Sequence, residues 1–525
     1  MNWELFVLIL YFSTMLGIGI FMFIRSRSKT DKDYFLGGRS TGPWVTAMSA
    51  QASDMSAWLL MGLPGSVLAF GLGQIWIGIG LLIGTALNWI LIAKRLRCFS
   101  QATNDSITVP QYLSNRFATK SKGLQVSCAI VFLVCFTIYV ASAFVAGTDV
   151  FVTLFPNLER WVAMLIFAAI LIIYTFLGGY KAVCWTDFFQ GLLMLAAVLA
   201  VPLIMVFAGD LEFSLLSNEI ISVGGNSYAF NTNMFSDFRE IINGLAWGLG
   251  YFGMPHIIVR FMGIKKASMV KKSAIVAISW VTLALSAVVL ISVFGRAFVL
   301  DGVSLGELLL YGDSQKLIFI TLARELFPAI IAGLLLSAII AASMSTADSQ
   351  LLVASSSFTS DIYKPLIRKN ASDKETLWVG RGVVVLISII AFVIAAVGGS
   401  GAQAIMNLVE CAWAGFGSAF GMVIILSVFW RRFTYKGALA GVITGALVDL
   451  IFLMFFTDTA TTFISGYTFF IDTGVYELIP GFIASAIASV SVTLLDKEPS
   501  KEVTDIFDNA MSLANNNEEM ASVEA

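Results

Sequence analysis

Long apolar segments separated by short polar ones follow one another along almost the whole chain of 525 residues. About 20 consecutive apolar residues are enough for a helix to cross the hydrocarbon core of a bilayer. Thirteen segments meet this criterion, near residues 3–24, 43–69, 73–93, 124–147, 160–178, 188–208, 240–262, 274–297, 318–347, 378–398, 403–429, 436–457 and 476–495. The first is long enough to span, so we expect a retained helix and not a cleaved signal peptide. The pattern predicts an all-α polytopic membrane protein with about thirteen transmembrane helices.

The composition agrees with this prediction and narrows the function. Hydrophobic residues make up 58% of the chain and charged residues 13%, which leaves too few polar groups to cover a soluble protein of this size. The net charge of −2 gives no basic field that would attract nucleic acid. A single histidine, His256, and five scattered cysteines show no metal-ligand spacing. We therefore expect free thiols and no enzymatic activity.

The distribution of Lys and Arg predicts the orientation in the membrane. Cytoplasmic loops are enriched in these residues, and with the N-terminus outside most of the 32 Lys and Arg fall on the inner side. We therefore expect one transmembrane domain over residues 1–495, with its N-terminus outside and its C-terminus inside. Residues 496–525 are polar and acidic, which predicts a mobile cytoplasmic tail with room for a short helix at "TDIFDNAMSLA".

Two of the spans contain helix-breaking residues. The second span carries "ASDMSAW" and then "GLPG", and the seventh carries "GLAWGLGYFGMPH". Five spans counted from each give two halves, about 43–208 and 240–429, that enter the membrane from opposite sides. Matching broken spans in two inverted halves indicate a transporter site at mid-membrane, because unpaired backbone groups need a ligand there. The alternative is that the glycines only allow close helix packing.

Oxygen ligands for a small cation are available near these breaks. Ala342, Ser345, Thr346 and Ser349 share one face of the ninth span. A hard cation such as sodium needs about five or six oxygen ligands, and hydroxyls with free carbonyls provide them without a buried net charge. Alternatively, the hydroxyls bond to carbonyls of their own helix. A carboxylate such as Asp54 costs ~2.5–3.5 kcal/mol near a bilayer centre, which favours a functional role for this residue.

Eight sequence blocks, in order along residues 1–495, resemble those of the sodium:solute symporter family. They are "YFLGGR", "ASDMSAWLLMGLPG", "TVPQYLSNRF", "FTIYVAS", "GGYKAVCWTDFFQ", "WGLGYFGMPHIIVRFM", "MSTADSQLLVASS" and "CAWAGFGSAFG". Within that family the blocks are most similar to those of its bacterial proline carriers. The resemblance implies one extra helix, a five-plus-five inverted repeat of the leucine-transporter type and two further helices. It also implies sodium-coupled import of a small zwitterionic amino acid, with L-proline as the first expectation, across a bacterial inner (cytoplasmic) membrane.

The same resemblance implies roles for individual residues. The implied sodium ligands are the carbonyls of Ala52, Met55 and Ala342 and the hydroxyls of Ser345 and Thr346, with Asp54 supporting the site. The implied substrate-binding residues are Ser56, Ala57, Tyr139, Trp247, Tyr251, Met254 and Pro255. Asp187 matches a carboxylate that some relatives use for a second sodium, and Arg39 matches an arginine tied to transport from the cytoplasmic side. Sodium, proline and the lipid bilayer are thus the expected partners, and no obligate protein partner is inferred.

Several of these residues also have structural explanations. Asp187 lies near the start of a helix, where an N-cap is the alternative to an ion site. Asp348 either pairs with a cytoplasmic Lys or Arg or draws the leaving sodium toward the cytoplasm. Trp247 and Tyr251 fit core packing as well as substrate binding. We expect His256 to be a satisfied polar residue and not a proton relay.

Other functions would leave different patterns. A channel would show a repeated pore motif or a ring of charges, and a sensor would need a signalling module longer than the tail. Within transport, Met254 and Ala57 stand where we expect glutamine and glycine in proline carriers. The alternative substrates are therefore another amino acid, a small carboxylate or a sugar acid, and protons are the alternative coupling ion.

Overall fold

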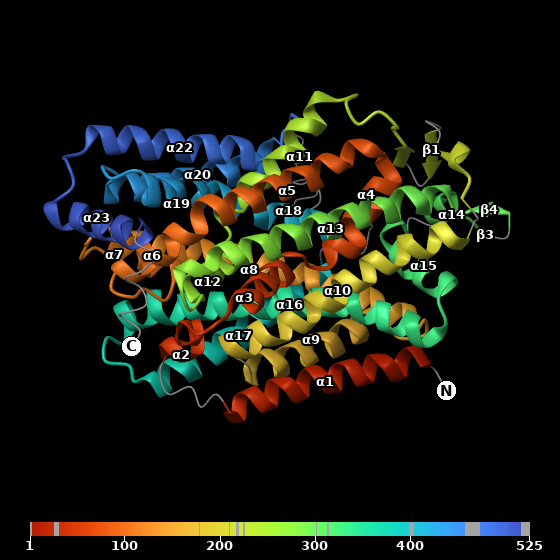
Figure 1. Ribbon diagram of the computed structural model, residues 1–525, viewed down its shortest axis with the longest axis horizontal. Helices are drawn as coiled ribbons and strands as arrows, with labels where there is room; N and C mark the ends of the chain where they lie inside the picture. Colours follow the sequence, from red (N-terminus) through yellow and green to blue (C-terminus); the bar gives the residue numbers. More distant parts are fainter. Residues whose placement is uncertain are drawn as a thin grey trace.

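The fold is almost entirely helical, and its helices lie roughly side by side along one direction (Figure 1). The computed structural model describes residues 3–25, 31–177, 179–208, 211–216, 220–223, 226–300, 302–311, 314–397, 404–456 and 473–515. The N-terminus and the two short hairpins lie at one end of the bundle, and helix α23 lies at the other (Figure 1). All described loops that join long helices therefore meet one of these two ends.

The first ten helices contain the first interrupted span. They are α1 (Trp3–Arg25), α2 (Asp31–Leu36), α3 (Pro43–Asp54), α4 (Leu63–Phe70), α5 (Ile75–Leu87), α6 (Lys94–Ala102), α7 (Val109–Arg116), α8 (Gly123–Leu154), α9 (Arg160–Leu177) and α10 (Tyr180–Ala208). Four tighter or wider helical turns join some of them, namely η1 (Gly37–Arg39), η2 (Trp58–Gly62), η3 (Leu72–Gln74) and η4 (Asn88–Ala93). Helix α6 continues the span of α5 through η4, so these three elements form one long rod.

The remaining helices contain the second interrupted span. They are α11 (Phe238–Gly250), α12 (Pro255–Gly263), α13 (Val270–Ala297), α14 (Leu305–Tyr311), α15 (Ile318–Leu326), α16 (Ala329–Ser357), α17 (Asp373–Val397), α18 (Ala404–Phe416), α19 (Met422–Phe429), α20 (Tyr435–Phe455), α22 (Leu478–Leu495) and α23 (Lys501–Asn515). The wider turns η8 (Phe358–Ile367) and η9 (Gly417–Gly421) extend α16 and join α18 to α19. Two antiparallel hairpins, β1 (Ile220–Val223) with β2 (Asn226–Ala229) and β3 (Val299–Leu300) with β4 (Val303–Ser304), lie in the loops.

Each predicted span coincides with helical structure over most of its length, and one predicted span combines two helices. Within the described residues, ten helices are long and apolar enough to cross a membrane, and two shorter apolar helices cover 58–70 and 160–176. The segment predicted at 318–347 is in fact α15 followed by α16, because Pro328 precedes the first residue of α16 and ends the preceding turn. The seventh span is divided between α11 and α12, so neither half alone is long enough to cross.

Glycines allow α5 and α11 to approach each other closely. A Cβ added to Gly84 would lie 2.3 Å from the carbonyl oxygen of Gly248, and one added to Gly80 would lie 2.2 Å from that of Gly244. Small residues four apart on both helices are the pattern that brings membrane helices together. Gly244 and Gly248 are therefore packing positions, in agreement with the alternative explanation for the glycines of the seventh span. The interruption of the helix begins after them.

We expect Gly84→Ala to destabilise the protein and Gly78→Ala to leave it unchanged. The added methyl group at Gly84 would meet the backbone of α11, whereas a Cβ at Gly78 meets no atom within 4 Å. Overpacking of this kind costs about 1–3 kcal/mol. Thermal unfolding in detergent measures the difference, and equal melting temperatures for the two variants would contradict the close packing of α5 on α11.

The segment expected to be a mobile tail contains a packed helix. Residues 501–515 form α23, in agreement with the short helix foreseen there, and Val503 and Phe507 are buried. The expected mobility does not describe α23, because the apolar face of this helix packs against α6. Residues 516–525 of the predicted tail lie outside the described residues. The five cysteines are free and buried, which confirms the prediction made from their spacing.

Candidate functional site

The first break lies in the middle of the molecule between α3 and η2. Helix α3 ends at Asp54, and Met55 has a non-helical backbone with φ −81° and ψ 77°. Ser56 and Ala57 follow, and both are buried. The backbone carbonyl of Asp54 accepts a hydrogen bond from the indole N–H of Trp58 at 3.3 Å. The helix is therefore interrupted inside the protein, where its end groups face other helices instead of lipid.

The second break lies between α11 and α12. A turn at Tyr251 to Met254 separates the helices, and Pro255 occupies the first position of α12, where its missing N–H costs nothing. Met254 and Pro255 are buried. The side-chain amide of Asn88 in η4 donates to the carbonyl of Tyr251 at 3.0 Å. The interruption therefore depends on a fixed partner from the first half of the chain.

Helix α16 brings its hydroxyl groups to the first break. The hydroxyl of Ser345 donates to the carbonyl of Ala52 at 2.7 Å and lies 3.2 Å from the carbonyl of Ala342. Three of the five predicted sodium ligands thus meet at one point. Thr346 follows Ser345 on the same helix, and Met55 lies in the break itself.

Asp54 joins the two breaks directly. The hydroxyl of Tyr251 donates to Asp54 Oδ2 at 2.5 Å, and both residues are almost completely buried. A hydrogen bond to a carboxylate inside a protein stabilises by about 1.5–3 kcal/mol. The two breaks are therefore in direct side-chain contact.

Three buried polar atoms around the first break have no hydrogen-bond partner among the described residues. They are Asp54 Oδ1, Thr346 Oγ1 and the hydroxyl of Tyr139. Helix α16, which carries Thr346, packs against both α3 and α8. An unpartnered buried polar atom costs about 1–3 kcal/mol, so three in one place indicate that a polar ligand completes the site.

Two aromatic residues at the end of α11 and just after it lie beside α18, and one of them reaches a small polar cavity. The ring of Trp247 stacks on Tyr476 with centroids 5.4 Å apart. The backbone carbonyl of Trp247 accepts a hydrogen bond from the indole N–H of Trp413 at 2.8 Å. Tyr251 meets Trp413 edge to face at 5.1 Å. A cavity of about 160 Å³ reaches Trp247 and is also lined by Glu410. Trp247 is thus packed and faces a cavity at the same time, which is compatible with both explanations given for it.

Asp187 lies apart from the first break and belongs to a buried ion pair. It is not an N-cap, because it is the eighth residue of α10 and its side chain crosses to other helices. Asp187 Oδ2 accepts from the hydroxyl of Ser49 at 2.6 Å and lies 3.3 Å from Arg260 Nη2. Arg260 also donates to the hydroxyl of Ser349 at 2.5 Å. No role is predicted for Arg260, although an arginine inside the apolar block "IIVRFM" is the signal that could have identified it.

Asp348 and His256 are two further buried polar residues. Both oxygens of Asp348 are buried without a hydrogen bond to a described residue, and Arg260 acts on this carboxylate only through space. The two explanations for Asp348 therefore both stay predictions. His256 is also buried with neither ring nitrogen hydrogen-bonded to a described residue, and it contacts the rings of Phe136 and Tyr139. It is therefore not the satisfied polar residue that was expected.

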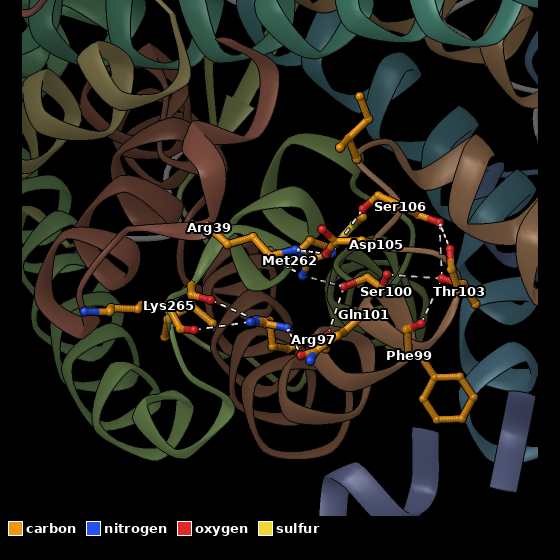
Figure 2. Close-up of polar contacts among 12 residues, drawn as sticks. Arg39, Arg97, Phe99, Ser100, Gln101, Thr103, Asp105, Ser106, Met262 and Lys265 are labelled. Atoms are coloured by element: carbon orange, nitrogen blue, oxygen red, sulfur yellow. Dashed lines mark hydrogen bonds and ion pairs between the residues drawn. The ribbon is translucent and has the colours of Figure 1, made fainter. Parts of the chain in front are cut away.

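Arg39 connects three elements at the α23 end of the bundle. Its guanidinium donates to the carbonyl of Met262 at 2.8 Å and to the hydroxyl of Ser100 at 3.0 Å, and it lies 2.7 Å from Asp105 (Figure 2). We call these four residues the Arg39 network. It ties the segment before α3 to the last turn of α12 and to α6, so the outer parts of the two broken spans are held together at this end.

Comparisons with known proteins agree with this architecture. The model of the sodium:solute symporter family matches residues 34–445. The high-affinity proline transporter PutP of Bacillus subtilis (strain 168) is 43% identical over 498 residues, which cover 94% of this chain and 98% of that protein. The sodium/proline symporter of Escherichia coli (strain K12) is 42% identical over 496 residues, which cover 92% of each chain.

Solved structures show the same fold. A Na+-coupled sialic acid symporter in a substrate-bound outward-open state has a TM-score of 0.70 and 20% identity, covering 95% of this chain and 99% of that one. Mhp1, a nucleobase-cation-symport-1 family transporter, has a TM-score of 0.52 and 14% identity, covering 90% and 97%. These neighbours confirm the predicted all-α membrane fold of the leucine-transporter type, and the family model matches most of the chain. The protein is a member of the sodium:solute symporter family, and hence a multi-pass membrane transporter and not an enzyme.

Proposed function

We propose that the protein imports L-proline together with sodium by alternating access. The observation that carries this proposal is the contact of Ser345 with the carbonyl of Ala52 beside the unpartnered Asp54 Oδ1 and Thr346 Oγ1. These are hard oxygen atoms at an interrupted membrane helix, which is where transporters of this architecture bind their ions and substrates. Proline as the substrate is supported by the proline transporters that share about 40% of this sequence.

The proposed sodium site uses five oxygen ligands. They are the carbonyls of Ala52, Met55 and Ala342 and the hydroxyls of Ser345 and Thr346. A hydroxyl oxygen coordinates a cation through its lone pairs, so Ser345 can bind sodium when its proton turns away from the Ala52 carbonyl. Asp54 supplies a negative charge nearby without being a required ligand. Support of a second sodium ion is the alternative role for Asp187, because Arg260 already neutralises the charge of its carboxylate.

The proposed substrate pocket lies between the two breaks and α8. A zwitterion suits such a place, because its carboxylate is attracted to free N–H groups and its ammonium to carbonyls or to Asp54. The proline ring would lie on the rings of Tyr139, Trp247 or Tyr251. Ser56, Ala57, Met254 and Pro255 complete the proposed lining, and all four are buried.

Sodium binding would couple to substrate binding through the Tyr251–Asp54 hydrogen bond. A sodium ion at Ala52 and Ser345 fixes the end of α3, and Asp54 then holds Tyr251 in the substrate pocket. One charge moved through ~100 mV yields ~2.3 kcal/mol, and a tenfold sodium gradient adds ~1.4 kcal/mol. One sodium per cycle therefore allows accumulation of the substrate on the order of several hundred-fold.

We propose the orientation from the distribution of Lys and Arg. The N-terminus would lie outside, and α23 with the Arg39 network would lie in the cytoplasm. The halves 43–208 and 240–429 would be the two inverted repeats of a single domain over residues 1–495. The cell membrane of a bacterium is the proposed location, which the bacterial relatives support.

Proline uptake into proteoliposomes tests this function. An inward sodium gradient should accelerate uptake of labelled proline at least tenfold over a potassium gradient of the same size, and an ionophore that collapses the sodium gradient should remove the difference. Uptake that is the same in sodium and potassium would contradict the coupling. Competition by other amino acids, carboxylates and sugar acids tests the alternative substrates that Met254 and Ala57 leave open.

A further inference from the structure

Helix α6 has contacts on two opposite sides at the end of the bundle that carries α23. On one side Ser100 belongs to the Arg39 network, and Arg97 donates to the carbonyl of Ile264 just after α12 at 2.8 Å. Phe99, between these two residues, points away from Arg39 (Figure 2). Helix α6 therefore presents one side to the ends of the broken spans and another side to a different partner.

That partner is α23. Its buried residues Val503, Phe507, Ala510 and Ala514 recur at intervals of three or four and form one apolar face. The ring of Phe507 meets Phe99 edge to face with centroids 5.2 Å apart. Ala514 packs with Cys98 of α6, which is fully buried there. The contact between α23 and α6 thus involves residues of α6 that directly precede Ser100.

Charged residues fix the position of α23. Arg116 of α7 is fully buried, donates to the carbonyl of Val503 at 3.2 Å and lies 5.1 Å from the centre of the Phe507 ring. Arg431, after α19, makes two hydrogen bonds to Asp508 at 2.8 and 2.7 Å. These hydrogen bonds lower the pKa of Asp508, so the pair stays charged at neutral pH. The helix is therefore held by α6, α7 and the loop after α19 together.

We propose that α23 is a brace that holds α6 against the Arg39 network and so favours the state closed to the cytoplasm. The proposal rests on the alternating-access function and the orientation proposed above. Opening toward the cytoplasm requires the ends of α3 and α12 to leave α6, and α23 sets where α6 stands. Loss of the brace increases the fraction of molecules that are open to the cytoplasm, and it weakens apparent binding of outside substrate in proportion to the loss of the outward-facing fraction.

The first experiment measures docking of α23 through Cys98. The full-length protein in proteoliposomes is treated with N-ethylmaleimide, and modification of Cys98 is followed by mass spectrometry. Phe507→Ala and Asp508→Arg should increase its rate at least tenfold, and Asp508→Arg with Arg431→Asp should return it toward the wild-type rate. Asp505→Arg makes the same charge change at an exposed position of α23 that acts on Arg431 only through space, so it is the control for the loss of the two hydrogen bonds. Equal rates for Asp508→Arg and Asp505→Arg would overturn the docking and with it the proposal.

The second experiment measures whether docking controls the closed end. Met262→Cys places a thiol at the buried last turn of α12, where Arg39 binds the backbone. Asp508→Arg should increase maleimide labelling of this position from the cytoplasmic side at least fivefold, and the charge swap should reverse the increase. Faster labelling of Cys98 with unchanged labelling at position 262 would overturn the brace. Both readouts are independent of proline, so a failure of the proposed transport function would be recognised separately in the uptake assay.

Discussion

Asp54→Asn is expected to abolish sodium-driven proline uptake at ordinary sodium concentrations while the protein stays folded. The substitution keeps the shape of the side chain and an acceptor for the Tyr251 hydroxyl, but it removes the buried negative charge. A carboxylate 4–8 Å from a sodium ion stabilises it by about 2–4 kcal/mol at an effective dielectric constant of 20. The sodium concentration for half-maximal uptake should therefore rise about 30- to 1,000-fold.

The control for this result is Asp449→Asn, which makes the same change at another buried carboxylate. Asp449 lies in α20 and accepts a hydrogen bond from Ser418 at 3.0 Å, outside the two breaks. Its substitution should leave the sodium dependence unchanged. Tyr251→Phe should have an intermediate effect of about tenfold, and it should raise the half-saturating concentrations of sodium and proline together. A normal sodium dependence in Asp54→Asn would show that the charge serves only the fold.

Ser345→Ala combined with Thr346→Ala is expected to raise the half-saturating sodium concentration about 100-fold. Each substitution removes one of the five proposed oxygen ligands, and a lost polar contact of this kind costs about 1–1.5 kcal/mol. Proline binding measured at saturating sodium should change much less. Uptake at graded sodium concentrations in proteoliposomes gives both values.

Ser343→Ala is the matched control on the same helix. The hydroxyl of Ser343 bonds to the carbonyl of Ile339 at 3.0 Å, so it already has a partner within α16. The control should behave as the wild type does. If the double variant also keeps the wild-type sodium dependence, the hydroxyls of Ser345 and Thr346 are not sodium ligands.

The membrane spans could be predicted from the sequence because each one depends on local hydrophobicity. The broken spans were also visible, since glycine, proline and a lone carboxylate interrupt an apolar run. The predicted start of α16 is wrong because the apolar segment continues through α15, whereas Pro328 separates the two helices. The packing of α23 was missed because its partners Phe99, Arg116 and Arg431 are far away in the sequence.

The candidate site was likewise predictable where it depends on local spacing, and not where it depends on contacts between distant segments. Helical spacing places Ser345 and Thr346 on one face, and the structure brings Ser345 to Ala52, although 293 positions separate them. The pairing of Asp187 with Arg260 could not be derived, because it depends on how α10 and α12 both pack against α3. The Tyr251–Asp54 contact was likewise out of reach, since it joins the two halves of the chain.

The buried pair of Asp187 and Arg260 constrains how the protein can move. The two side chains come from α10 and α12 and are fully shielded from solvent at 3.3 Å. Doubling the separation of two such charges costs about 2–3 kcal/mol at an effective dielectric constant of 20. A movement of α12 that leaves α10 behind therefore costs this much, which favours a pivot at the non-helical residues around Met55 and Met254.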